Sequence, residues 1–346
     1  MMVRVLASVT AGLLLCHCAT GAPRHSPEAA ARVLALRLVP ESKELTWAFP
    51  TSSGRPVSLP APDWVEPLVK ERARFTSAVK ELGERGAADT ALELAAMMWR
   101  LWILAHDEAG GRAFLALVLD STPDQKPSRA RALALYGDSL LSFRVGDLRA
   151  SRARSLAALD VARVLNEREA EGLARLALSR VELSENQFAS AGEHAQAARA
   201  LLRDLGPPYQ QAALHLHAQA ARALGQTEEA AALFAQSLAL NRQLGDRGMV
   251  LVELHNLGHV ELRRGNVDAA EQNFVECTQL GGASDDPYEL ALRLFNRAAV
   301  AHGRGDRLTA VSLLEKARSL LASSNVSLAS DDAAEFADLE RRLRAD

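Results

Sequence analysis

The stretch Leu254–Phe274, LHNLGHVELRRGNVDAAEQNF, sets the fold of this chain. Apolar residues recur at helical spacing on both sides of a Gly265-Asn266 pair, and glycine or asparagine in the left-handed conformation commonly ends a helix. Two small residues, Gly258 and Ala270, flank this turn. The stretch therefore predicts two antiparallel helices that meet closely where their side chains are small.

The same turn recurs along the chain with a period of about 40 residues. The turn residues are separated by 40, 39, 40 and 40 residues, and one further step back reaches another polar break; they are His106, Gly146, Asn186, Gly225, Gly265 and Gly305. The residue five positions later is always small: Gly111, Ser151, Ala191, Ala230, Ala270 and Ala310. Seven positions earlier all but Trp99 are small: Ser139, Ser179, Ala218, Gly258 and Ala298. A constant register over six units predicts a repeat array.

The composition favours helices and argues against nucleic-acid binding. Of the 346 residues, 48 % are hydrophobic but only 5 % are aromatic, and alanine and leucine prefer helices to strands. The formal net charge of −3 gives no basic field for nucleic acid. Two of the three cysteines, Cys16 and Cys18, lie at the very start, so the remaining Cys277 has no partner for a disulfide in a processed chain.

Residues 1–22 have the parts of a secretory signal. Arg4 provides the positive charge, and the apolar run Val5–Leu15 is too short for a comfortable membrane span. This pattern predicts an exported protein on the periplasmic face of a bacterial cell envelope.

The end of this segment resembles the lipobox of bacterial lipoproteins. Leu15 precedes Cys18 by three positions, as that motif requires, although His17 stands where a small residue is usual. The resemblance predicts lipid attachment at Cys18 and hence an anchor in the outer membrane. Ordinary cleavage after Gly21 and an uncleaved anchor are the alternatives.

The repeat array resembles the tetratricopeptide family, in a variant longer than the usual 34 residues. Units of this length are similar to the arrays of large bacterial transcription regulators. The resemblance implies an all-α fold, a right-handed superhelical solenoid of about six antiparallel helix pairs, over residues 64–322. Residues 23–63, which are rich in proline, are expected to form a tether or a small cap, and residues 331–344 a capping helix at the end of the array.

In tetratricopeptide proteins the first helix of each unit lines a concave groove that binds peptides. Carried over to this chain, the resemblance implies that Asn256 and Asn296 grip the backbone of a bound peptide through their amide groups. Arg222 and Arg263 would suit an acidic partner. The remaining residues implied for the groove are Tyr136, His215, His255, His259 and Phe295. For each of these, a role in helix packing or simple solvation is the alternative.

The sequence contains no phosphate-binding loop, no GxSxG elbow and no HExxH motif. We therefore expect no enzyme, no catalytic residues and no cofactor. His255 and His259 share a helix face, but a third ligand from His215 would lie too far away, so no metal site is predicted. Cys277 occupies a packing position and is expected to be buried and inert.

These observations predict a non-enzymatic scaffold of the cell envelope that binds a peptide or partner protein in its groove. A narrower hypothesis is an assembly or pilot lipoprotein of an envelope secretion or pilus machine, which rests on family analogy alone. Two further hypotheses are a cytoplasmic signalling regulator, in which residues 1–22 are not a signal, and an enzyme with an unrecognised site.

Overall fold

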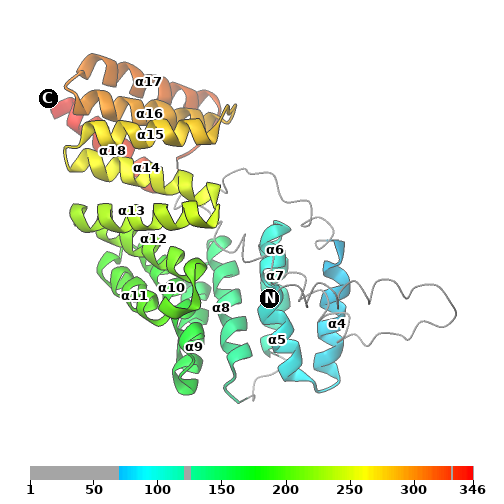
Figure 1. Ribbon diagram of the computed structural model, residues 1–346. Helices are drawn as coiled ribbons and strands as arrows, with labels where there is room; N and C mark the ends of the chain where they lie inside the picture. The colour runs from blue at the N-terminus through cyan, green and yellow to red at the C-terminus, as the bar shows by residue number, and fades with distance from the viewer. Residues whose placement is uncertain (1–69, 121–125, 329, 346) are drawn as a thin grey trace, which may run out of the picture.

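The computed structural model describes residues 70–120, 126–328 and 330–345, and within them every regular element is a helix (Figure 1). The predicted signal at 1–22, the lipidation site Cys18 and the proline-rich segment 23–63 lie outside the described residues. No helix in the described part is long and apolar enough to cross a membrane.

The helices form six consecutive antiparallel pairs, as the repeat predicts. The pairs are α5 and α6 (Ala88–Met98, Arg100–Leu104) with α7 (Glu108–Asp120), α8 (Arg129–Arg144) with α9 (Leu148–Leu165), α10 (Arg168–Ser184) with α11 (Phe188–Leu201), α12 (Pro207–Ala223) with α13 (Thr227–Leu244), α14 (Arg247–Arg263) with α15 (Val267–Gly281), and α16 (Pro287–Gly303) with α17 (Arg307–Ser323). A short 3-10 turn, η1 (Arg203–Leu205), precedes α12. The pairs stack side by side into an elongated solenoid (Figure 1).

Every predicted turn residue adopts the left-handed backbone conformation. Their φ angles lie between 52° and 80°, at His106, Gly146, Asn186, Gly225, Gly265 and Gly305. Glycine enters this region without steric cost and asparagine tolerates it better than most residues, so the turn that ends each first helix is encoded locally. This confirms the register predicted from the sequence.

The small residues allow the two helices of a pair to approach closely. A Cβ atom at Gly258 would lie 2.4 Å from Cε1 of Phe274 on the partner helix, which is closer than real atoms come. In another unit, Ser179 is fully buried and donates a hydrogen bond of 2.9 Å to the carbonyl oxygen of Ala191. Larger side chains at these positions would force the helices apart.

Helices outside the six pairs lie at both ends of the array. α4 (Arg72–Glu84) packs on the first unit, where the buried ring of Phe75 contacts Trp102 and Phe114. α18 (Ser330–Ala345) is the helix predicted to cap the last repeat. Its Leu339 and Leu343 do join the apolar cluster of α16 and α17. However, α18 also reaches back to α12 and α14, so it is more than an end cap.

Candidate functional site beneath the C-terminal helix

The C-terminal helix α18 lies across the face that carries most of the predicted groove residues. We call this the inner face and define it by Arg222 of α12, His255 and His259 of α14, and Phe295 and Asn296 of α16. All five contact α18 or a residue that contacts it, as the distances below show. Side chains of α12, α14 and α16 therefore share one face, and that face is occupied by a segment of the same chain.

Glu335 of α18 is held by three cationic or ionisable side chains. Its Oε1 lies 2.6 Å from Nη1 of Arg222 and 4.0 Å from Nη2 of Arg263, and its Oε2 lies 3.3 Å from Nε2 of His259. Burial alone would raise the pKa of Glu335, but nearby positive charges, including those of Arg222 and Arg263, lower it overall. Glu335 is thus a buried, ionised carboxylate.

A second carboxylate, Asp332, anchors the start of α18. The hydroxyl of Tyr288 donates a hydrogen bond to Oδ2 of Asp332, and Nε2 of His255 lies 3.6 Å from Oδ1. Burial works against ionisation, yet the interactions with His255 and Tyr288 bring the pKa of Asp332 below its usual value. The two acidic residues lie three positions apart, so they face the array from the same side of α18.

Apolar contacts continue along the same side of α18. The ring of Phe336 stacks on Phe295 with centroids 4.7 Å apart and planes 19° apart, and Phe295 stacks in turn on His259 at 5.2 Å. Leu339 and Leu343 follow at helical spacing and are 2 % and 4 % exposed. α18 therefore binds the array as an amphipathic helix binds a groove, with acidic residues at one end of its buried stripe.

Asn296 joins the two histidines of α14. Its Oδ1 lies 3.0 Å from Nε2 of His259, and its Nδ2 lies 3.3 Å from Nδ1 of His255. Burial is the main cause that lowers the pKa of His259, to about 4, so this imidazole is neutral at physiological pH. The amide that was expected to grip a peptide backbone is here engaged with side chains of the protein itself.

Three more of the predicted groove residues lie apart from α18. Asn256 donates to the carbonyl oxygen of Val252 on its own helix, at 3.0 Å. His215 pairs with the fully buried Glu253 at 3.0 Å. Tyr136 is buried edge-on against Trp99, with centroids 5.8 Å apart. The structure gives these three residues packing partners, and their role in binding a peptide stays a prediction.

The fit between α18 and the array is incomplete on one side. A cavity of about 50 Å³ remains between α14, α16 and α18, with both charged and apolar walls. Its charged and polar lining residues are His259, Arg263, His302, Glu335, Asp338 and Arg342. A space of this size and polarity can hold more than one water molecule. The packing between α18 and the array is therefore looser here than in the core of the repeats.

The contacts of α18 and of Tyr288 were not anticipated from the sequence. For Asp332, Glu335 and Phe336 the sequence predicted only a cap with a polar outer face. Their spacing of three and four residues is the signal that marks them as one side of a helix. It does not say which surface that side covers.

Cys277, predicted to be buried and inert, is partly buried beside the apolar cluster of α13 and α14. Burial raises its pKa to about 11, and its Sγ lies 3.5 Å from the carbonyl oxygen of Leu251. A thiol of this kind is protonated at neutral pH and is a poor nucleophile. It therefore offers no catalytic chemistry of its own.

Comparison with known proteins supports the fold and goes no further. No protein-family model matches the chain, and no curated protein sequence matches it either. Three solved structures are similar to it at 12–15 % identity. The first is the Cut9–Hcn1 hetero-tetramer of the APC/C, with a TM-score of 0.53 and 14 % identity over 81 % of this chain and 52 % of that chain. The second is a Rap protein complexed with competence and sporulation factor, with a TM-score of 0.52 and 12 % identity over 92 % of this chain and 95 % of that chain. The third is a signal-transduction ATPase with a tetratricopeptide repeat sensor from Pyrococcus horikoshii, with a TM-score of 0.55 and 15 % identity over 92 % of this chain and 51 % of that chain.

The chain spans about half the length of the first and third of these proteins. At such low identity the likeness concerns the backbone alone. The described part of the chain is thus an all-α solenoid of the tetratricopeptide type.

Proposed function

We propose that this protein is a non-enzymatic scaffold whose inner face binds an acidic, amphipathic segment of a partner protein, and that α18 is the internal ligand of that face. The observation that carries the proposal is the ion pair between Glu335 and Arg222, with oxygen and nitrogen 2.6 Å apart, beside the stacked rings of Phe336 and Phe295. A helix held by charge at one end and by apolar side chains along its length uses the helix-in-groove mode of recognition.

The chemistry of α18 suggests the chemistry of the partner. The inner face offers Arg222, with its side chain 11 % exposed, and Arg263, with its side chain 34 % exposed, to a carboxylate. It offers the ring of Phe295 to an aromatic or aliphatic side chain one position further on. A partner segment with an acidic residue directly before an apolar one, and further apolar residues three and seven positions later, would reproduce the contacts of Glu335, Phe336, Leu339 and Leu343.

Two of the structures that are similar to this chain are complexes. One of the similar structures is a Rap protein complexed with competence and sporulation factor, and another is a complex of Cut9 with Hcn1. Both pair a helical array with a second molecule. This likeness is consistent with a binding role for the present chain, and the identity of its partner is not carried over.

The proposal is tested with a synthetic peptide of residues 330–345 that carries a fluorescent label. Its anisotropy is measured against a chain that ends at residue 328 and whose helical circular dichroism is intact. We expect saturable binding, weakened about tenfold or more by Arg222→Ala, since a buried charge pair loses one partner. Arg304→Ala is the matched control, because Arg304 pairs on the outside of the array with Asp268 and Glu271. A folded truncated chain that does not bind the peptide would refute the proposal.

We further propose that the protein is exported and held at the periplasmic face of the cell envelope by a lipid on Cys18. The support is the pattern of residues 1–22, with Arg4, an apolar run and the Leu15–Cys18 spacing. Cells are labelled with a fatty-acid analogue, with Cys18→Ala as the control. Label in the native chain that is absent from the variant supports the anchor, and an unlabelled full-length chain in the cytoplasmic fraction contradicts export.

A further inference from the structure

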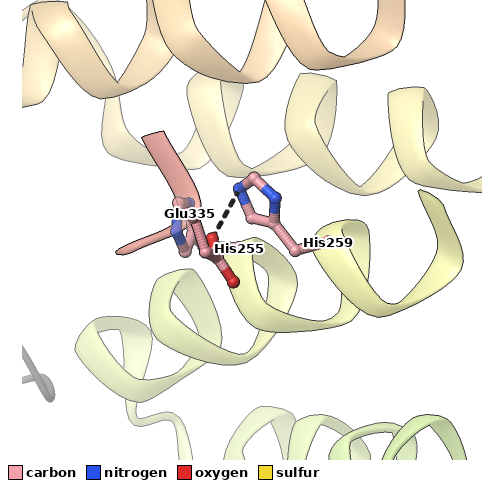
Figure 2. Close-up of side chains that lie close together, drawn as sticks. All are labelled: His255, His259 and Glu335. Atoms are coloured by element: carbon pink, nitrogen blue, oxygen red, sulfur yellow. Dashed lines mark ion pairs between the residues drawn. The ribbon is translucent and has the colours of Figure 1, made fainter. Parts of the chain in front are cut away.

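Three potential metal ligands meet beneath α18. His255, His259 and Glu335 each offer one ligand atom, and these atoms all lie within 4.8 Å of one another (Figure 2). The histidines lie four residues apart on α14, so both rings project from the same side of that helix. The carboxylate comes from α18, on the opposite side of the cluster.

The spacing of the ligand atoms suits a small divalent cation. Nε2 of His259 and Oε2 of Glu335 are 3.3 Å apart, as the dashed line in Figure 2 marks. Two ligands at about 2.0–2.2 Å from a tetrahedral zinc ion lie roughly 3.3 Å from each other. The rings of His255 and His259 are also close, with centroids 4.7 Å apart. Little movement is needed to close the three groups around one ion.

Two atoms of the cluster lack a hydrogen-bond partner among the described residues. Nε2 of His255 and Oε2 of Glu335 are both buried and unsatisfied. Nε2 of His255 has only a carboxylate oxygen of Asp332 within ion-pair range, at 3.6 Å, and Oε2 of Glu335 has only Nε2 of His259, at 3.3 Å. Leaving such groups unsatisfied is costly, and most buried polar atoms in folded proteins are paired. A cation between them would satisfy both.

One further polar side chain, Asn296 of α16, contacts the cluster. It contacts Nδ1 of His255 and Nε2 of His259. A metal bound through Nε2 of His259 would therefore replace the contact between that nitrogen and Oδ1 of Asn296. Binding through Nε2 of His259 requires the ring proton to move to Nδ1.

We propose that His255, His259 and Glu335 form a binding site for a divalent transition metal of the zinc class. Two imidazoles and one carboxylate are a ligand set that zinc favours, with the fourth position left for water or for Asp332. The sequence alone did not suggest the site, because its third ligand lies on α18 and not on the neighbouring repeat. Arg222 already holds the other oxygen of Glu335, and its positive charge opposes a cation at the site. Because the site also has only three protein ligands, it should bind zinc more weakly than a closed four-ligand site.

A metal at this site would tie α18 to α14 and so hold the inner face closed. Binding to the docked state alone shifts the equilibrium toward it by mass action. The protein would then bind its partner less readily when the metal is present. This consequence rests on the proposed function, whereas the site itself does not.

The experiment measures zinc uptake by the untagged full chain by isothermal titration calorimetry. Cys16 and Cys18 are replaced by serine in every variant, because the Cys16-His17-Cys18 run could itself bind zinc. We expect one zinc ion per chain, and about tenfold or greater weakening by Glu335→Gln or by His255→Ala. His194→Ala is the matched control, because His194 faces the single carboxylate of Glu182 at 3.5 Å, and it should leave uptake unchanged.

A second measurement locates the metal between the two helices. Zinc should slow the hydrogen exchange of α18 amides in the parent chain, and it should have no such effect in Glu335→Gln. His255→Ala keeps the Arg222–Glu335 pair, so it removes a ligand without releasing α18 at its charged end. Absence of uptake by the parent chain, or equal uptake by parent and both variants, would overturn the proposal. Because no peptide is present, failure here and failure of the scaffold proposal are separate results.

Discussion

Replacing Phe336 by alanine should release α18 from the inner face without unfolding the repeats. Phe336 is 6 % exposed and stacks on Phe295 at 4.7 Å. It is the only aromatic side chain that α18 contributes, and it lies between the charged contact of Glu335 and the apolar contacts of Leu339 and Leu343. Its loss therefore removes the middle of the contact surface.

The size of the effect follows from the burial of the ring. Truncating a buried phenylalanine costs about 3–5 kcal/mol, of which the stacked aromatic pair accounts for roughly 0.5–1.5 kcal/mol. We take the lower end, about 3 kcal/mol, because the site lies beside a cavity of about 50 Å³ and can relax. A change of about 3 kcal/mol lowers the docking equilibrium of α18 about a hundredfold.

Hydrogen exchange measured by mass spectrometry reports this local opening. In Phe336→Ala, amides of α18 should exchange up to about a hundredfold faster, and the upper limit is the exchange rate of α18 when it is undocked. Amides of α10 and α11 should keep the rates of the parent chain. Leu308→Ala is the control, because Leu308 is an apolar residue on the neighbouring α17 but is 85 % exposed. Unchanged exchange in α18, or an equal increase across α10 and α11, would refute the reasoning.

Two further predictions concern the repeats themselves. Gly258→Ala should lower the free energy of unfolding by about 1–3 kcal/mol in urea titrations, since its Cβ would lie 2.4 Å from Phe274. Gly192→Ala is the control: the nearest atom to its Cβ would be 3.5 Å away, so it should be neutral or stabilising by up to about 1 kcal/mol. Equal effects of the two substitutions would contradict the close approach of the helices at Gly258. In a Cys16→Ser/Cys18→Ser chain at pH 8, Cys277 should react with Ellman's reagent far more slowly before unfolding than after it. With a pKa of about 11, only about one thiol in a thousand is ionised in the folded chain. Equal rates before and after unfolding would contradict the raised pKa.

The repeat could be predicted from the sequence because its determinants are local. A residue such as Gly265 or Asn186 indicates a left-handed turn at its own position. A small residue such as Gly258 indicates the close approach of a partner helix that follows within about twenty residues. Because the turns recur every 40 residues or so, the structure expected for one clear unit can be assigned to the other units as well. The turns and the pairing of the helices could therefore be predicted from the pattern.

The occupied inner face could not be predicted, because its contacts are distant in sequence. Amphipathic spacing shows that one side of α18 will be buried, but it does not show which apolar surface of the array that side packs against. Arg222 and Glu335 are 113 residues apart, and no repeat relates them. His215 and His255 hold equivalent places in their units, yet only His255 lies beside α18, whereas His215 pairs with Glu253. The repeat pattern therefore predicted the same role for His215 and His255, but only His255 lies where α18 contacts the array.

The central claim, that α18 occupies the binding face as an internal ligand, is tested most directly by competition within one molecule. The labelled peptide of residues 330–345 is titrated into the full chain and into the chain that ends at residue 328. A tethered ligand acts at an effective concentration in the millimolar range, so the full chain should bind the peptide at least about tenfold more weakly than the truncated chain. Equal affinity for the two chains would contradict the claim.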